Sequence, residues 1–273
     1  KFLHEDVLDT ITPILNKLFV SNEKGDILDI PSIIQTQNGL YEEVSDLNGI
    51  AIPCMYYDEI NGKRSISDIP VLYDMIQQRY EQMDDKNEYL TEAIESVNEN
   101  MSSIGDYLHA ANVFKAIDEK LYSKLRQITH NDCNWLSDDD IDICKERINA
   151  YIDTDCVEYE PEAEFTIIHH SNEDAHTNID RALNECDLDH LLFRFTARAD
   201  LVTKDTVWEM KCTSEISIDH KIQVVIYAWL WNIVYPGDKK TFKIFNIKNC
   251  ELMTLNDEFD KFDIIVKEII RGK

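Results

Sequence analysis

Apolar and polar positions along the chain follow two different periodicities. Apolar residues recur every three to four positions in five segments, which predicts amphipathic helices. The predicted helices span residues 2–19, 68–128 with breaks near 84–86 and 102–103, 137–153, 217–234 and 256–271. Pro13 should kink the first of them. Ser137 and the three aspartates after it are typical of a helix start, because acidic side chains favour its positive end.

Strand-forming segments dominate the second half of the chain. β-Branched and aromatic residues cluster there in five short stretches that are bounded by turn residues. The predicted strands span residues 157–169, 191–203, 206–212, 241–247 and 250–255. Helices precede, interrupt and follow these strands, so the order predicts a mixed β-sheet flanked by helices, an α/β or α+β fold.

The first hundred residues are acidic and mainly helical in pattern. They also contain a predicted β-hairpin over residues 49–68, because the run GIAIPCMYY precedes the turn formers Asn61 and Gly62. We therefore expect two domains. Residues 1–100 would form an acidic, mainly helical lobe with a small hairpin, and residues 101–273 would form the core with the sheet.

Charge restricts where a nucleic acid could bind. The 273 residues have a formal net charge of −26 at pH 7, which argues against a generally basic protein that coats DNA. Residues 198–273 contain 12 basic and 12 acidic residues, so the whole excess of acid lies in the first 197. A nucleic-acid-binding surface would have to be local and formed mainly by the C-terminal third.

Two further features narrow the setting. No apolar run approaches the roughly 18 residues that a membrane span needs, and no secretory signal pattern opens the chain. Seven cysteines without a C-x-x-C motif suggest reduced thiols and argue against a structural zinc site. We expect an intracellular protein, cytoplasmic, nuclear or in a viral factory, with no membrane partner. The first residue is Lys rather than Met, which suggests excision from a longer polypeptide.

The segment ARADLVTKDTVWEMKC carries the side chains that point to chemistry. If Lys204 and Asp205 form a two-residue turn between two strands, Asp200 lies opposite Glu209 with Cβ atoms roughly 5 Å apart. Side chains alternate along a strand, so Glu209 and Lys211 share one face. Two opposed carboxylates repel each other unless a cation compensates, and their oxygens suit Mg²⁺ or Mn²⁺. The segment therefore predicts a metal site.

The order of these residues resembles that of the PD-(D/E)XK nuclease superfamily. An acid on one strand is followed by acid-x-lysine on the next, and a glutamine and a tyrosine follow on a helix. The closest resemblance is to the RecB-like exonuclease branch, which includes helicase-linked and CRISPR-associated exonucleases. In that branch an upstream helix carries a metal-binding histidine in a G-x-x-x-H setting. The matching positions over residues 101–273 are Gly105, His109, Asp200, Glu209, Lys211, Gln223 and Tyr227.

The resemblance implies a restriction-endonuclease-like core that hydrolyses phosphodiester bonds in DNA with Mg²⁺ or Mn²⁺. It implies metal ligation by the side chains of His109, Asp200 and Glu209 and by the backbone carbonyl of Met210, the histidine tilting the preference toward Mn²⁺. The implied catalytic residues are Asp200, Glu209, Lys211, Gln223 and Tyr227.

The roles of the last three follow from their chemistry. Lys211 would orient or help deprotonate the attacking water, its pKa lowered by partial burial. Gln223 would hold water or Lys211, and Tyr227 would donate a hydrogen bond to a phosphate oxygen. His220 shares their helical stripe and is expected to be a neighbour rather than a ligand.

Structural interpretations of the same residues remain open. Asp200 and Glu209 could be a strand pair neutralised by Lys211 and Arg198. His109 could be a partly buried histidine without a ligand. The stripe with Gln223 and Tyr227 could be a helix face that packs on the sheet.

Other acidic, histidine and cysteine residues are less specific. Glu162 and Glu164 could be additional acids near the metal or charges on an edge strand. The run HHSNEDAH at 169–176 has no zinc spacing and is interpreted as a loop. Only Cys250 follows Cys212, so the iron–sulfur cluster of some RecB-like nucleases is not expected.

The sequence therefore predicts a divalent-metal-dependent deoxyribonuclease of exonuclease type. DNA repair, recombination or viral genome processing are the settings we expect. The expected partners are DNA and a helicase or other replication or repair protein. The alternative is a catalytically silent nuclease fold that binds nucleic acid or a protein.

Overall fold

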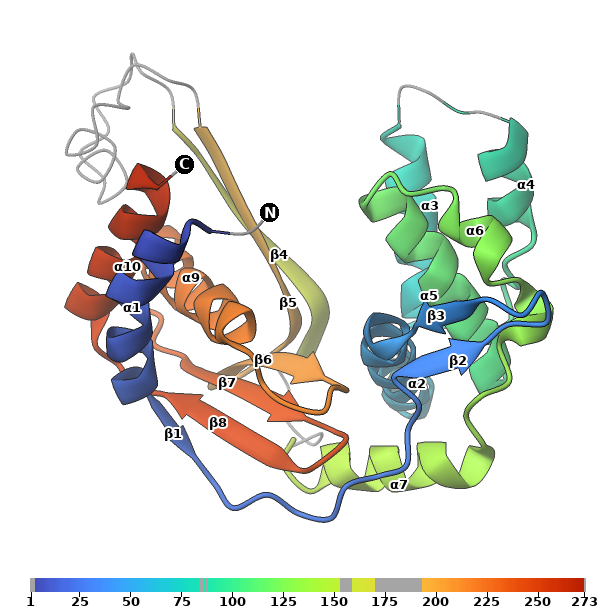
Figure 1. Cartoon of the computed structure of the whole chain (residues 1–273), viewed down its shortest axis with the longest axis horizontal. Helices are drawn as coiled ribbons and strands as arrows, with labels where there is room; N and C mark the ends of the chain where they lie inside the picture. Colours follow the sequence, from blue (N-terminus) through green and yellow to red (C-terminus); the bar gives the residue numbers. More distant parts are fainter. Residues whose placement is uncertain (1–2, 84–85, 87, 153–158, 170–192, 273) are drawn as a thin grey trace.

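A computed structural model describes residues 3–83, 86, 88–152, 159–169 and 193–272 of the chain. They form a six-stranded mixed sheet with helices on both faces, together with an N-terminal helical part (Figure 1). The predicted mixed sheet flanked by helices is thus confirmed. In the described part of the chain, no helix combines the length and the apolar composition needed to cross a membrane.

The sheet has the strand order β1-β8-β7-β6-β5-β4. Only β6 and β7 pair in parallel, and the other neighbours are antiparallel. A parallel pair needs a crossover connection, which the helix α9 (Ile218–Val234) supplies. The strands are β1 (Phe19–Ser21), β4 (Tyr159–His169), β5 (Phe193–Thr203), β6 (Thr206–Lys211), β7 (Thr241–Asn246) and β8 (Glu251–Leu255).

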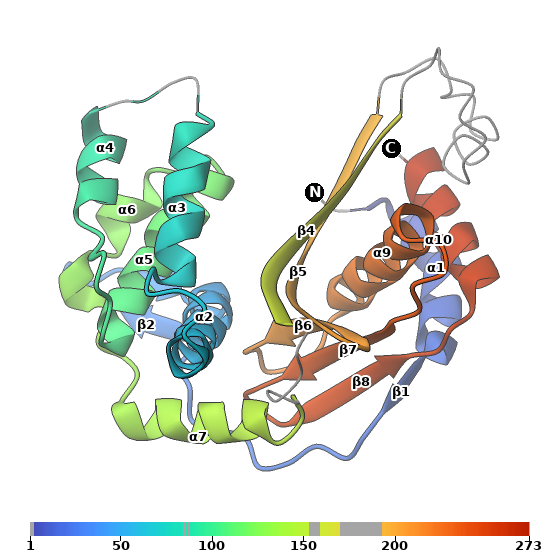
Figure 2. The same cartoon turned by 180° about the vertical axis from the view of Figure 1, so that it is seen from behind.

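One face of the sheet is covered by α9 together with α1 (Glu5–Leu18) and α10 (Phe259–Arg271) (Figure 2). These helices bury their apolar stripes in one core, which contains the fully buried Trp229. Pro13 lies inside α1 without ending it. We call the sheet and these three helices the sheet unit.

The second face of the sheet meets a helical lobe. Its central pair, α2 (Ser45–Arg64) and α5 (Ile104–Asp118), shares a core with Leu201, Trp208 and Met210 of the sheet. The Tyr57 hydroxyl of α2 contacts the Met210 sulfur at 3.6 Å. The other elements of the lobe are β2 (Ile33–Gln35), β3 (Tyr41–Glu43), α3 (Val71–Glu81), α4 (Glu88–Glu95), α6 (Lys124–Gln127), a 3₁₀ turn (His130–Asp132) and α7 (Asp138–Asn149). In Figure 1 the lobe and the sheet unit meet at α2, β6 and α7 and diverge toward α3 and the far ends of β4 and β5.

The predicted hairpin over residues 49–68 is wrong, because this segment is the larger part of α2. Ala51, Ile52, Tyr56 and Tyr57 are all buried, so the helix is apolar on more than one side. A helix surrounded by protein loses the polar stripe that identifies helices in a sequence, and a short apolar run then looks like a strand.

The two halves of the molecule also do not divide at residue 100. The edge strand β1 pairs with β8, and α1 packs on α9 and α10, so residues 5–21 belong to the sheet unit. Residues 104–149 belong to the helical lobe, since α5 packs between α2 and α3 and α7 packs on α2. The lobe is therefore an insertion between β1 and β4.

Gly105 has a packing reason within this lobe. It lies in the first turn of α5, which begins with a capping box formed by Ser103 and Asp106. A Cβ atom at Gly105 would stand 2.8 Å from the backbone carbonyl oxygen of Cys133. A Cβ atom placed in the same way on Gly62, in the last turn of α2, would meet no packed neighbour within 4 Å.

Gly105→Ala should lower the free energy of unfolding by about 1–3 kcal/mol, because a backbone carbonyl has to move. Gly62→Ala is the matched control and should raise it by about 0.5–1 kcal/mol, since alanine loses less conformational entropy in a helix. Urea denaturation followed by circular dichroism measures both. Equal stability of the wild type and Gly105→Ala would show that this close approach imposes no constraint.

Candidate functional site

The β5–β6 hairpin brings Asp200 and Glu209 together. Lys204 and Asp205 form the predicted two-residue connection between the strands. Leu201 pairs with Trp208, so the next pair along this register is Asp200 with Glu209. The described ladder ends at Leu201, which leaves a gap between the two strands beside the acids.

Asp200 is held in this gap by the backbone. Its Oδ2 atom accepts a hydrogen bond of 2.5 Å from the amide of Met210. Burial, followed by the negative charge of Glu209, raises the pKa of Asp200 well above its usual value, and Lys211 opposes this only in part. Burial and the neighbouring acid thus disfavour the charged form of this carboxyl group.

Glu209 is 1% exposed. Oε1 forms an ion pair with the ammonium of Lys211, two residues along the same face. Among the described residues, Oε2 is buried without a hydrogen bond of standard geometry, although Glu209 lies close enough to the Tyr227 hydroxyl to add to the effect of burial in raising the pKa of Tyr227. An orphaned buried carboxylate oxygen is costly, and it marks a position where a cation or a donor would be stabilised.

The expected lowering of the Lys211 pKa is wrong. Burial alone would lower it, but the carboxylates of Glu209 and Asp200 together raise the pKa of Lys211 above its usual value. The side chain is 21% exposed and lies in its charged form beside the two acids. Lys211 is therefore a cation that holds Glu209 rather than a neutral base.

The carbonyl of Met210 faces the same gap. In an extended strand the N–H and C=O groups of one residue point toward the same neighbouring strand. Since the Met210 amide donates to Asp200 across the gap, its carbonyl oxygen is directed toward β5 as well. Trp208, Met210 and Cys212 point to the lobe core on the other face, as the strand alternation predicts.

Gln223 and Tyr227 approach the same gap from α9. Ser217 caps this helix in a capping box with His220, which confirms the predicted helix start. Gln223 Nε2 donates to the Tyr227 hydroxyl at 2.6 Å, and that hydroxyl donates to the carbonyl of Arg198 at 2.6 Å. Burial, with the charges of Glu209 and Asp200, raises the pKa of Tyr227 well above its usual value, so the phenol stays protonated.

His220 serves the helix cap. Its Nδ1 accepts a hydrogen bond from the Ser217 amide at 3.1 Å. Burial and the charge of Lys211 lower the pKa of His220 to about 4. The ring is therefore neutral, and it lies outside the group of residues that line the gap.

These residues open into one cleft of about 600 Å³. The volume is that of a pocket for a small molecule or for part of a larger polymer. Its walls come from β4, β5, β6 and α9 of the sheet unit and from α3 and α5 of the lobe. The cleft is lined by Arg79, Asp118, Glu164, Thr196, Ala197, Arg198, Asp200, Glu209, Lys211, Asp219, Ile222, Gln223, Ile226 and Tyr227.

A third acid, Glu162, lies opposite Asp200 on β4. The pairs of Pro161 with Leu201 and of Ala163 with Ala199 flank it. Glu162 has a φ of 53°, a left-handed conformation that costs about 1–3 kcal/mol outside glycine and is often found at functional sites. Burial raises the pKa of Glu162 to about 7, although its Oε2 lies 3.2 Å from Arg198 Nε.

The sequence left Glu162 open as either a metal-side acid or an edge charge. Its place in the site depends on the register of β4 against β5, which are joined by a long connection. No local signal encodes that register, whereas the two-residue turn fixes the register of β5 against β6. One weak signal in the sequence pointed to Glu162, which is an acid in the predicted strand that precedes the strand of Asp200.

His109 is not brought to the carboxylates. Its Nε2 atom lies 2.8 Å from the Ser96 hydroxyl, and its ring centre is 4.7 Å from that of His130. Asp118, at the end of the same helix, does line the cleft. It follows His109 by nine positions, which is about two and a half helical turns. The two side chains therefore lie on opposite sides of α5, and a G-x-x-x-H pattern cannot reveal which side faces the sheet.

The acidic side chains of the cleft provide the type of oxygen ligand that a divalent cation binds. Asp200, Glu209 and the Met210 carbonyl supply hard oxygens around one gap, and Glu209 Oε2 has no other partner. Within the described ranges, no three histidine, cysteine, aspartate or glutamate side chains are grouped closely enough to hold a metal ion as they stand. A ligand set of two carboxylates and one carbonyl would leave room for water and substrate oxygens.

His109 should instead govern acid stability. Burial, with the charge of His130, lowers the pKa of His109 to about 4, below its unfolded value of about 6.5. Its contribution to stability is therefore complete above about pH 6.5 and is lost as the pH falls through about 4.

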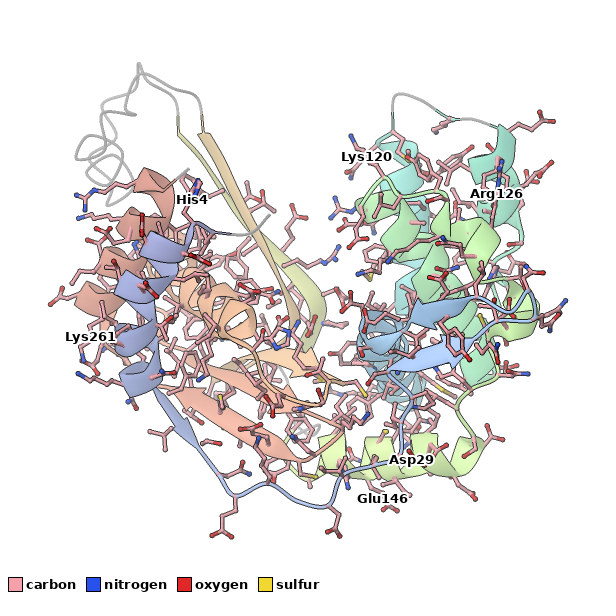
Figure 3. The ribbon with its side chains drawn as sticks, viewed as in Figure 1. His4, Asp29, Lys120, Arg126, Glu146 and Lys261 are labelled. Carbon is pink, nitrogen blue, oxygen red and sulfur yellow. The ribbon has the colours of Figure 1, made fainter. Side chains whose placement is uncertain are left out.

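Between pH 7 and pH 4 the wild type should lose about 2–3 kcal/mol more unfolding free energy than His109→Gln, which can still bond Ser96 but cannot titrate. Denaturation at a series of pH values measures this. His4→Gln, at the exposed start of α1, is the control and should follow the wild type (Figure 3). Parallel curves for the wild type and His109→Gln would contradict a neutral buried His109.

Comparison with known proteins adds no assignment. No protein-family model, no curated protein and no solved structure matches the chain. The chemistry of the cleft therefore has to be judged from its own geometry.

Proposed function

We propose that the protein is a divalent-metal-dependent nuclease that hydrolyses phosphodiester bonds in DNA in the cleft beside Asp200 and Glu209. One observation carries the proposal: the buried Glu209 and the half-buried Asp200 lie side by side in a strand gap, with one buried oxygen of Glu209 unpartnered among the described residues and one lysine beside it. A structural ion pair would not need the second acid. An exonuclease-type action remains part of the proposal through the resemblance of the motif.

Asp200, Glu209 and the Met210 carbonyl are the groups that would hold Mg²⁺ or Mn²⁺. When bound, the cation would offset charge that develops on the phosphate and lower the pKa of a bound water. Asp200 is prepositioned for this, because its Oδ2 atom is fixed by the Met210 amide. His109 is not included among the ligands.

Lys211 would act as a fixed cation in this reaction. It holds one oxygen of Glu209, which aims the other oxygen into the gap. Its ammonium can also donate to a phosphate oxygen or to the attacking water. Gln223 and Tyr227 form a short hydrogen-bonded chain at the edge of the cleft, and the protonated phenol would donate to phosphate by exchanging its bond to the Arg198 carbonyl.

A catalytically silent module is the second candidate. The charge of the whole chain favours it, since a net charge of −26 weakens attraction for polyphosphates. The presence of Asp200, Glu209 and Lys211 together in one cleft argues against a silent module. We propose DNA repair, recombination or viral genome processing as the setting, with a helicase or another repair protein as partner.

Activity should depend on the acids and the lysine of the hairpin. With Mg²⁺ or Mn²⁺ the wild type should degrade end-labelled single- or double-stranded DNA, and a chelator should stop it. Asp200→Asn should reduce the rate to background, and Lys211→Ala should reduce it about 10²–10⁴-fold. Denaturing gels of a time course measure these rates.

The turn of the same hairpin supplies the matched controls. Asp205→Asn and Lys204→Ala remove the same charges from exposed side chains outside the cleft, and both should cut like the wild type. Equal activity in all five proteins would trace the cutting to a contaminant. Absence of cutting by a folded wild type would favour the silent module.

Cation binding should require Asp200 but not His109. Mn²⁺ at about 100 times its Kd should raise the melting temperature of the wild type and of His109→Gln by roughly 5–10 °C. It should leave Asp200→Asn unchanged. Without metal, Asp200→Asn should melt above the wild type, because burial raises the folded-state pKa of Asp200 and this costs stability at every pH above its unfolded pKa. Loss of the Mn²⁺ effect in His109→Gln would return that histidine to the ligand set.

A further inference from the structure

The cleft beside the carboxylates continues as a groove along β4 and β5. A second hollow of about 370 Å³ adjoins it. The two hollows share Arg79, Glu164, Thr196 and Arg198 as lining residues. Because these four residues bound both spaces, the hollows form one path that runs from α9, past Asp200, to α3.

One wall of this groove is the polar stripe of α3. Met75, Gln78, Arg79 and Gln82 line the second hollow and follow the i, i+3, i+4, i+7 spacing of one helix side. Leu72 and Ile76, on the adjoining side of α3, are buried in the lobe core. The wall therefore presents two amides and a guanidinium, which are donors suited to phosphate and base edges.

The facing wall carries Arg198 of β5. Its guanidinium lies over the ring of Phe114, 4.8 Å from the ring centre, and its Nε atom is 3.2 Å from Glu162. Arg79 has a comparable partner, since its guanidinium lies 3.5 Å from Asp118. The side chain of Arg198 is 27% exposed, and that of Arg79 is 35% exposed.

The ion pair between Arg79 and Asp118 is exchangeable, because both side chains are about a third or more exposed. Such a pair contributes about 0–1 kcal/mol, whereas arginine binds phosphate with two parallel hydrogen bonds. A phosphate that enters the groove can therefore displace Asp118 from Arg79. Arg198 is held in the groove by the more buried Glu162 and by Phe114, and it offers its remaining N–H groups to a phosphate.

We propose that Arg79 and Arg198 form a two-sided clamp that grips the phosphate backbone of a single DNA strand as it passes the carboxylates. This inference rests on the proposed function and names the form of its substrate. Arg79 comes from the helical lobe and Arg198 from the sheet unit, so the clamp requires both halves of the molecule. Gln78 and Gln82 would contact the sugars and bases of the same strand.

The charge of the groove favours one strand over two. Double-stranded DNA carries one negative charge per roughly 1.7 Å of its axis, shared by two backbones. The cations that line the two hollows are Arg79, Arg198 and Lys211. The acids that line them are Asp118, Glu162, Glu164, Asp200, Glu209 and Asp219. A second backbone would therefore meet carboxylates rather than cations. One backbone can follow the two arginines, with one phosphate beside Asp200 and Glu209.

Binding without cleavage tests the clamp. All proteins would carry Asp200→Asn, and the probe is a fluorescently labelled 20-nucleotide oligothymidylate, followed by anisotropy at low salt in a chelator. Arg79→Gln should raise Kd about tenfold or more and reduce the salt slope of binding by about one. Arg126→Gln removes the same charge on the outer side of the lobe and should leave Kd within about twofold (Figure 3).

Arg198 is tested together with its partner. Arg198→Gln combined with Glu162→Gln leaves no buried carboxylate unpaired and should also raise Kd about tenfold. Glu162→Gln alone should bind as tightly as the parent or more tightly, because Arg198 is released.

Three results would overturn the clamp. They are no binding by the parent, an equal loss in Arg79→Gln and Arg126→Gln, and equal affinity for a duplex hairpin of the same length. The proposed nuclease activity fails separately. If the wild type does not cut with Mg²⁺ or Mn²⁺ while binding still depends on Arg79, the clamp stands and the hydrolysis does not.

Discussion

The candidate site depends on negative charge that the fold holds in its interior. The hairpin turn sets Asp200 beside Glu209, and the register of β4 adds Glu162 on the other side. Buried carboxylates are tolerated only when their protons or their neighbours neutralise them, and here the pKa values of Asp200 and Glu162 rise accordingly. Lys211 and Arg198 each hold one acid, which leaves the group short of positive charge. In the proposed reaction, a divalent cation would supply the missing positive charge.

The apolar packing around the site keeps these acids in place. Ala197 and Ala199 of β5 and Val207 of β6 belong to the core under α9, whereas Leu201, Trp208 and Met210 belong to the core under α2. The hairpin is therefore held from both faces, and its charged residues emerge where the pairing of the two strands ends. Rigid elements position such groups more accurately than loops do. The same arrangement places the helical lobe against the sheet, so that α3 and α5 contribute to the cleft.

The sequence predicted the parts of this structure that local rules encode. The two-residue turn fixed the neighbourhood of Asp200 and Glu209, and Ser137 and Ser217 marked the helices that they cap. The sequence failed where long-range packing decides. The segment 49–68 is a helix because it is surrounded by protein, His109 turns away because of how α5 is oriented, and Lys211 is a cation because two acids outweigh its burial. The histidine-rich run near residue 170 lies mostly outside the described residues, since only His169 belongs to β4.

The insertion of the helical lobe between β1 and β4 has a mechanical consequence. The polypeptide crosses between the halves once on leaving β1 and once on returning to β4. At this junction Arg147 of α7 donates to the carbonyls of Asp26, Ile247 and Lys248. The lobe also shares a hydrophobic core with Leu201, Trp208 and Met210, so it is held more firmly than a terminal domain on a single linker. The width of the passage between Arg79 and Arg198 is therefore set by this packing.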